Sequence, residues 1–237
     1  MKWEPSRRMQ LIDIDENLWA VEQQFPLGMG LELPVRSHVV RLPDGGLLLF
    51  SPIPTLPGLK DAIDALGPVR ALIAQSSFHH LGLEPALAAW PEAKLYGPVE
   101  LLGKRRDLPF ESGLHEAPEP LWSGVIDQHV VEGAPRLGEV AFFHRPTSTL
   151  LLCDLVFNVQ RPRRAWSRFV LGLTGSWGHF GFSRLIRTTF TDRTALRRSM
   201  DALLAWKPAR VALTHGAPVE QDATARLEAA FASIRPD

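Results

Sequence analysis

The chain has 237 residues, and its 26 Lys and Arg residues balance its 26 Asp and Glu residues, so its formal net charge is zero. A neutral chain has no overall field that draws it to nucleic acid or to anionic membranes, and we expect no nucleic-acid partner. Hydrophobic residues make up 45% of the sequence, which is enough for a sizeable core. The length fits one large domain, and we expect a single α/β domain over residues 1–237.

The sequence also predicts the compartment. The single cysteine, Cys153, excludes an internal disulfide and fits a reducing compartment. The first residues carry charges with no apolar core after them, which predicts no signal peptide. No apolar run approaches the roughly 20 residues of a membrane-spanning helix. We therefore expect a soluble, cytoplasmic protein.

The first half of the chain is expected to form strands and then to alternate between helices and strands. Apolar and β-branched runs predict strands over residues 18–23, 37–42, 47–50, 71–74 and 93–96. Helical spacing predicts helices over residues 59–66 and 83–90 and near 101–105. Residues 109–121 are rich in Pro, Gly and Glu, which predicts a surface loop.

The alternation continues in the second half. Apolar runs predict strands over residues 126–131, 139–144, 149–154 and 210–214. Thr191-Asp192 is typical of a helix start, and helices are expected over residues 195–206 and 221–234.

The polar loop after the strand over 71–74 is the most distinctive stretch. It ends in the adjacent pair His79 and His80, and a helix is expected to follow from Leu83. In open α/β sheets, loops that join a strand to a helix lie at the edge where ligands bind. A histidine pair there is either a metal or catalytic group or a pair bonded to the backbone, and the loop alone leaves both open.

Two later strands also end in residues that can bind a metal. Asp154 follows the apolar run 150–153, and His215 follows the strand over 210–214. Imidazoles and carboxylates are ordinary ligands for zinc and for iron, and four of them would close a tetrahedral shell. The candidate site therefore consists of His79, His80, Asp154 and His215.

This arrangement resembles the metallo-β-lactamase superfamily, whose fold is a four-layer αββα sandwich. That family carries a His-x-His-x-Asp-His loop after a strand, an Asp after a later strand and a His-Gly near the C-terminus. The loop pattern falls on Gln75, Ser77, His79 and His80, with Gly82 at the glycine that follows. The later motifs fall on Cys153-Asp154 and His215-Gly216. More narrowly, residues 42–46, 51–54 and 153–158 look like an uncharacterised branch, a domain of unknown function (4336).

Departures from the family pattern imply that one of its two metals is lost. Gln75 and Ser77 stand where the first metal has histidines, and no histidine lies near Pro135 or Arg136, where its third should be. The second metal's four positions keep competent ligands, although His79 replaces a carboxylate. The resemblance implies a one-metal remnant of a two-metal site, with Gln75 and Ser77 lining its pocket.

The resemblance implies a metallo-hydrolase-like protein, and these residues would hold one divalent metal, zinc ahead of iron. His79, His80 and Asp154 are the expected catalytic residues. Three neutral imidazoles and one carboxylate leave a positive charge on a divalent ion, which would suit a small anionic substrate. Two alternatives stay open. One is a binding or scaffold protein without metal, in which the polar cluster pins strand ends. The other is a metal-dependent redox enzyme.

Residues 160–198 hold nine arginines, with aromatic residues such as Trp166 and Phe169 among them. One interpretation is a solvated helical face whose aliphatic stems cover the core. A second is a substrate lip in which Arg161, Arg163 or Arg164 binds phosphate or carboxylate. The third is membrane-surface contact through residues 161–171.

Overall fold

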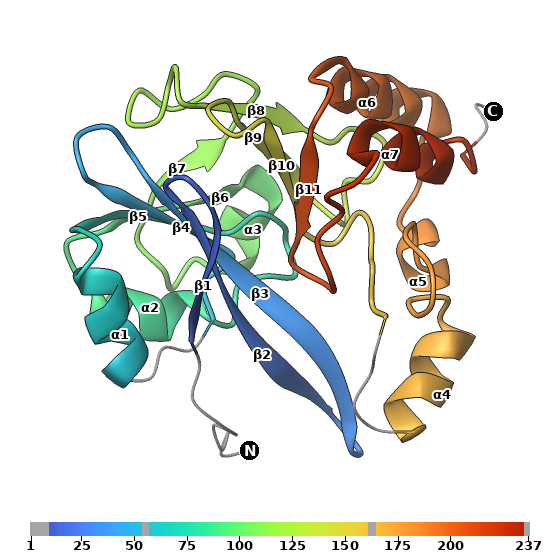
Figure 1. Cartoon of the computed structure of the whole chain (residues 1–237), viewed down its shortest axis with the longest axis horizontal. Coiled ribbons are helices and arrows are strands. Elements are labelled where there is room, and N and C mark those ends of the chain that lie inside the picture. The colour runs from blue at the N-terminus through green and yellow to red at the C-terminus, as the bar shows by residue number, and fades with distance from the viewer. Residues whose placement is uncertain (1–9, 54–56, 161–164, 235–237) are drawn as a thin grey trace.

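Two β-sheets pack against each other between helices in the computed structural model, which describes residues 10–53, 57–160 and 165–234 (Figure 1). The larger sheet has seven strands in sequence order. They are β1 (Leu11–Asp15), β2 (Leu18–Gly28), β3 (Leu31–Arg41), β4 (Leu47–Phe50), β5 (Val69–Ile73), β6 (Lys94–Pro98) and β7 (Phe110–Leu114). β1 to β4 pair antiparallel, and β4 to β7 pair parallel.

The smaller sheet has the order β11-β10-β9-β8. Its strands are β8 (Ile126–Val130), β9 (Val140–His144), β10 (Thr149–Leu152) and β11 (Arg210–Leu213). The last two run parallel, with Leu152 beside Leu213. Because parallel neighbours end at the same edge of a sheet, the residues that follow β10 and β11 lie close together.

Helices cover the outer face of each sheet. Against the larger sheet lie α1 (Pro57–Asp64), α2 (Leu83–Ala89) and α3 (Val99–Lys104). Against the smaller sheet lie α6 (Arg193–Ala205) and α7 (Ala223–Phe231), and α5 (Arg184–Arg187) packs on the same core. The remaining helix, α4 (Ala165–Leu173), lies beside β3 of the larger sheet. The start expected at Thr191-Asp192 is confirmed, since the Asp192 side chain accepts a hydrogen bond from the amide of Ala195.

Alternation along the strands divides the apolar residues among three layers of core. Leu48 and Phe50 of β4 point to the space between the sheets, where they meet β9 and β10 residues. Leu47 and Leu49 point the other way, toward the helices. Such strands are apolar throughout because both faces are buried. The predicted four-layer αββα sandwich is confirmed.

Two differences from the predicted elements concern edge strands. The loop expected over 109–121 was wrong in its first part, because β7 pairs there with β6 at the edge of the larger sheet. Its Gly113 lets the strand lie close to α3, since a Cβ there would be 2.9 Å from the Val99 side chain. β1, at the opposite edge, had not been assigned to particular residues.

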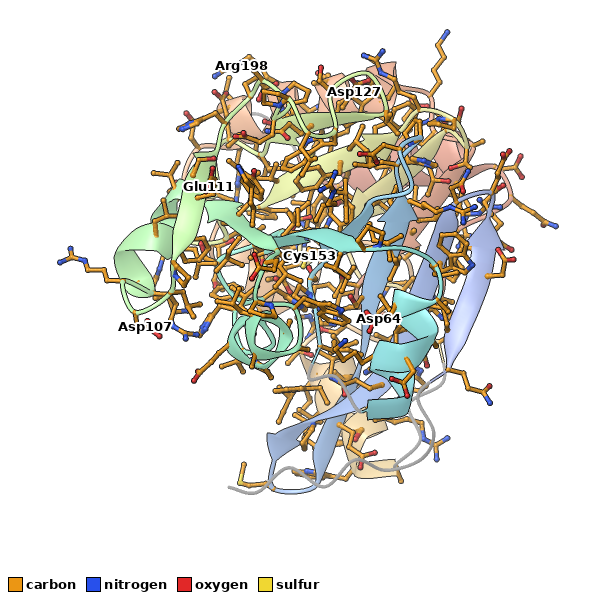
Figure 2. The ribbon with its side chains drawn as sticks, turned by 90° about the vertical axis from the view of Figure 1, so that its left-hand side faces the viewer. Asp64, Asp107, Glu111, Asp127, Cys153 and Arg198 are labelled. Atoms are coloured by element: carbon orange, nitrogen blue, oxygen red, sulfur yellow. The ribbon has the colours of Figure 1, made fainter. Side chains whose placement is uncertain are left out.

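Charged side chains lie mostly at the periphery. Figure 2 shows Asp107, Glu111 and Arg198 pointing outward, whereas Cys153 is fully buried. Burial first, and then the nearby Asp154 and Glu139 carboxylates, raise the pKa of the Cys153 thiol. Within the described ranges, no helix is both long enough and apolar enough to cross a membrane.

Candidate metal centre

Three strand ends meet at one edge of the sandwich. His79 lies in the loop between β5 and α2, Asp154 lies just after β10, and His215 just after β11. The amide of Arg36 in β3 donates to the carbonyl of Thr214 at 2.8 Å, which ties the end of β11 to the larger sheet. Both sheets therefore contribute to the site.

Two glycines allow the close approaches that this meeting requires. A Cβ at Gly82 would lie 1.8 Å from the carbonyl oxygen of Pro52, so only glycine lets the histidine loop pack there. Gly216 has φ +108°, and a Cβ on it would lie 2.2 Å from the carbonyl oxygen of Asn158. Its position fixes the turn that presents His215.

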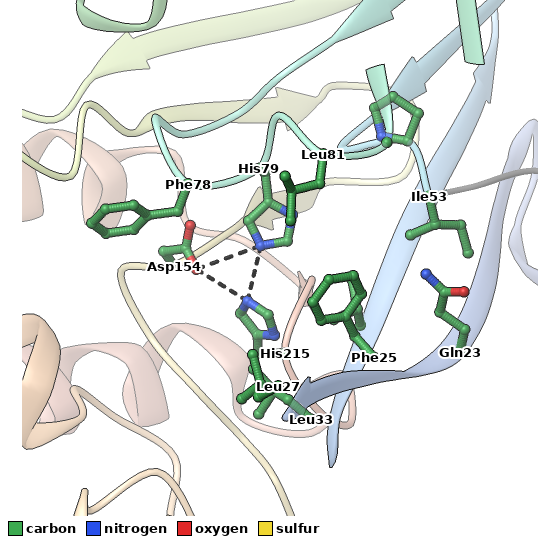
Figure 3. A pocket seen from close by; sticks show the side chains of 13 residues that line it. Gln23, Phe25, Leu27, Leu33, Ile53, Phe78, His79, Leu81, Asp154 and His215 are labelled. Atoms are coloured by element: carbon green, nitrogen blue, oxygen red, sulfur yellow. Dashed lines mark hydrogen bonds and ion pairs between the residues drawn. The ribbon is translucent and has the colours of Figure 1, made fainter. Parts of the chain in front are cut away.

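The side chains of His79, Asp154 and His215 converge on one point, as Figure 3 shows. The His215 Nε2 lies 3.0 Å from the Asp154 Oδ1 and 3.0 Å from the His79 Nε2. The His79 Nε2 lies 3.5 Å from the same Asp154 oxygen. Asp154 and His215 are buried, and the His79 ring is partly open to the adjacent cavity.

A backbone carbonyl sets which nitrogen of His215 faces this point. The His215 Nδ1 lies 3.1 Å from the carbonyl oxygen of Pro34, and a carbonyl only accepts, so Nδ1 carries the hydrogen. In neutral His215 the Nε2 lone pair is then turned toward Asp154. A lone pair 3.0 Å from a carboxylate oxygen is repelled unless a positive charge, a proton or a metal ion, lies at that point.

The Asp154 carboxylate is itself held on its other side. Its Oδ2 accepts a short hydrogen bond from the Ser76 hydroxyl, so Oδ1 is left to face the imidazoles. Burial opposes ionisation of Asp154. The His79 and His215 rings outweigh it and hold the pKa of this carboxyl well below its usual range.

A fully buried carboxyl, that of Glu139 just before β9, holds the backbone around Asp154. It accepts hydrogen bonds from the amides of Cys153 (2.9 Å), Asp154 (2.7 Å) and Leu155 (2.6 Å). Burial, and after it the Asp154 charge, raise the pKa of Glu139 to about 8, against the effect of the three amides. Sequence reasoning missed this role. The only signal was an acidic residue opening the apolar run 140–143.

The donor set and its spacing fit a single divalent metal ion. Two imidazole nitrogens and one carboxylate oxygen are ordinary zinc ligands, and ligand atoms around a tetrahedral zinc at about 2.0–2.2 Å would be roughly 3.3 Å apart. The observed separations are 3.0, 3.0 and 3.5 Å. Three protein ligands leave a coordination position open, as in catalytic rather than structural zinc sites.

His80, expected as a fourth ligand, is not brought to this point. Its Nδ1 lies 3.1 Å from the Arg105 guanidinium, which also donates to the His80 carbonyl at 3.3 Å. Since a guanidinium only donates, Nδ1 accepts. Burial first, then the Lys104 and Arg105 charges, lower the pKa of His80. Adjacent residues of this loop project to different sides, which the sequence did not reveal.

Gln75 and Ser77 were expected to line the pocket, but neither is among the described residues that line the two cavities beside the site. The Gln75 side chain accepts a hydrogen bond from the Ser51 hydroxyl at 3.2 Å, inside the core. The Ser77 amide donates to the Leu137 carbonyl at 3.0 Å. The Gln75 side chain and the Ser77 amide therefore hold the loop in place.

Two apolar cavities adjoin the site and share Asp154 and His215 in their linings. One of about 230 Å³ lies under the β2–β3 hairpin and is lined by His79, Asp154 and His215 (Figure 3). The other, of about 490 Å³, extends toward α4 and α5 and is lined by Asp154, His215 and Arg136. Arg136 stands where the missing third histidine was expected. Arg161, Arg163 and Arg164, which the sequence suggested as a substrate lip, lie outside the described part of the chain.

The sequence matches the family described as Domain of unknown function (DUF4336) over residues 15–167, more than half of the chain. No curated protein matches it. Solved structures match over nearly the full length. The metallo-β-lactamase from Erythrobacter litoralis has a TM-score of 0.68 at 12% identity, over 97% of this chain and 100% of that chain.

Two further metallo-β-lactamases give the same result. The structure from Hirschia baltica has a TM-score of 0.66 at 11% identity, over 98% of this chain and 100% of that chain. The structure from Pontibacter korlensis has a TM-score of 0.63 at 13% identity, over 95% and 99%. At such identities the likeness shows the fold alone. The chain belongs to the DUF4336 family and has the metallo-β-lactamase fold.

Proposed function

We propose that the protein is a metallo-hydrolase-like enzyme with one divalent metal held by His79, Asp154 and His215, zinc ahead of iron. The observation that supports this most is the His215–Asp154 contact. The Pro34 carbonyl keeps a hydrogen on Nδ1, so the close approach of Nε2 to the carboxylate requires a proton or a metal ion between them, and a metal ion would bind both groups. His80, held by Arg105, is left out of the proposed ligand set.

When bound, such an ion would polarise a substrate group or a water molecule. The chain's own residues supply the rest. Ser76 and Glu139 orient Asp154, and Pro34 orients His215. Apolar walls such as Phe25, Leu33 and Leu81 keep bulk water away from the site. Low polarity around the site strengthens electrostatic interactions within it.

The proposed substrate is a small anionic molecule. The exposed Arg136 lines the larger cavity together with Asp154 and His215, and no hydrogen bond or ion pair to it is found among the described residues. An unpaired guanidinium at the wall of an apolar cavity is suited to a carboxylate or a phosphate.

Hydrolysis of two general probes tests this function. We expect the purified protein with added zinc to hydrolyse 4-nitrophenyl acetate or bis(4-nitrophenyl) phosphate. Treatment with EDTA, or the Asp154→Asn variant, should lower the rate roughly 100-fold. Asp127→Asn, a change in a surface ion pair with Arg145 in the smaller sheet, is the control and should keep the rate.

The alternative is a binding protein that keeps the fold without metal. A single shared hydrogen could join the two histidine Nε2 atoms at their 3.0 Å separation. Equal and EDTA-insensitive rates in the parent and in Asp154→Asn would favour this alternative.

A further inference from the structure

The inward-facing row of β2 contains a polar residue among apolar ones. Val21, Gln23, Phe25 and Leu27 alternate along one side of the strand. Val21 and Phe25 belong to an apolar cluster, and Gln23 lies between them with 8% of its surface exposed. A buried polar side chain in an apolar row carries more information than an exposed apolar one.

The Gln23 amide has no hydrogen-bond partner within the described residues, at either its oxygen or its nitrogen. Val35 stands opposite Gln23 in the β2–β3 pair, and Phe25 and Ile53 line the same cavity, but their side chains offer no polar atom. Two buried hydroxyls near the cavity are bonded: Ser37 donates to the carbonyl of Phe50 at 2.9 Å, and Ser51 donates to Gln75. The hydroxyls of Ser77 and Thr214 also lack a partner within the described residues, but these two residues do not line this cavity. An unbonded buried amide is costly to the fold, which points to a partner from outside the chain.

Gln23 lines the same 230 Å³ cavity as His79, Asp154 and His215 (Figure 3). Whole ligand sites usually measure about 300–1,000 Å³, so this cavity would take one arm of a molecule rather than all of it. A ligand could therefore present one group to the three metal-capable side chains and another to Gln23.

We propose that Gln23 is a specificity-determining residue that pairs with an amide edge of the substrate. Its side chain offers an N–H donor and a C=O acceptor together. A primary carboxamide or a cyclic imide presents the complementary donor and acceptor on one edge and satisfies both. A lone carbonyl or ether satisfies only half. The proposal rests on the metallo-hydrolase-like function, because it names a group that the substrate of that function would carry. The pairing of Gln23 with an amide does not itself require the metal.

Binding of two fragments of nearly equal shape tests the proposal. Benzamide carries the amide edge, whereas acetophenone has a methyl group in place of the NH₂. Dissociation constants are measured by NMR titration with the EDTA-treated protein, the zinc-loaded protein and two variants. Gln23→Met removes the amide at nearly constant length. Gln24→Met makes the same change on the opposite side of β2, outside the cavity.

The measured quantity is the ratio of the acetophenone dissociation constant to that of benzamide. This ratio should be roughly tenfold higher in the parent and in Gln24→Met than in Gln23→Met, with and without zinc. Gln23→Met should fold at least as stably as the parent, because it removes an unpaired buried amide. The same preference ratio in the parent and in Gln23→Met, or no binding of either fragment to the parent, would overturn the proposal. If the parent keeps its preference for benzamide but takes up no zinc, only the proposed metal function is contradicted.

Discussion

His215 shows how one backbone contact sets the chemistry of a side chain. The Pro34 carbonyl, in β3 of the larger sheet, fixes the hydrogen on Nδ1, and the ring stacks on Phe157 with the planes 8° apart. The free Nε2 then has a single orientation toward Asp154 and His79. A ring held on two sides in this way would lose little further conformational freedom on binding a metal.

Glu139 plays the corresponding part for Asp154. Both of its oxygens accept amide hydrogens from the strand end that carries Asp154. Both carboxyl oxygens can accept amide hydrogens, even where one of them carries a proton, whereas a glutamine in its place would turn an NH₂ group, which has no acceptor, toward at least one amide.

We expect Glu139→Gln to lower the free energy of unfolding by about 1–3 kcal/mol, because a buried amide would lose its acceptor. Zinc affinity should fall about 10- to 100-fold, because Asp154 would be less well oriented. Urea unfolding and zinc titration measure the two effects. Glu132→Gln, at an exposed residue seven positions earlier, is the matched control. A variant as stable as the parent would show that Glu139 does not hold this strand end.

At the scale of elements, the sequence allowed us to predict which strand ends form the site. It did not allow us to predict the direction of His80 or the role of Glu139. The apolar runs before His79, Asp154 and His215 end abruptly in polar residues, and strands that end so lie at one sheet edge. The direction of His80 depends on Arg105, the residue that follows α3, a contact that no local pattern encodes. Glu139 acts on residues 14 to 16 positions away, so its role appears only in three dimensions.

Two strands also carry histidines that remain neutral inside the fold. Burial lowers the pKa of His38 in β3 to about 3 and that of His144 in β9 to about 4, from an ordinary 6.5. Between pH 6.5 and about 4, the unfolded chain therefore binds protons at these positions that the folded chain does not. The free energy of unfolding falls as the pH falls through this window, by about 1.4 kcal/mol per pH unit for each histidine.

Glu139 acts in the opposite direction, because its raised pKa of about 8 favours the folded state as the pH falls toward 4.5. Variants separate the contributions. We expect His144→Gln and His38→Leu each to reduce the loss of stability on going from pH 6.5 to pH 5 by about 2 kcal/mol, as measured by urea unfolding. Parallel pH profiles for parent and variants would contradict neutral burial of these rings.

Over the whole molecule, the sandwich assembles its site from residues far apart in sequence. His79 and His215 are 136 positions apart and come from different sheets. The fold could be predicted because the spacing of apolar residues in each run, and the residues at which the run ends, are typical of a strand or of a helix. The Gln23 amide and the two cavities could not be, because they arise from the hairpin lying over the strand ends.

The protein's metal content tests the central claim most directly. Elemental analysis of the purified parent should find about one zinc per chain, bound as at a three-ligand site. His215→Ala should lose it, and His80→Ala should keep it, because the structure places His80 against Arg105. A metal-free parent, or equal metal in the parent and in His215→Ala, would contradict the claim.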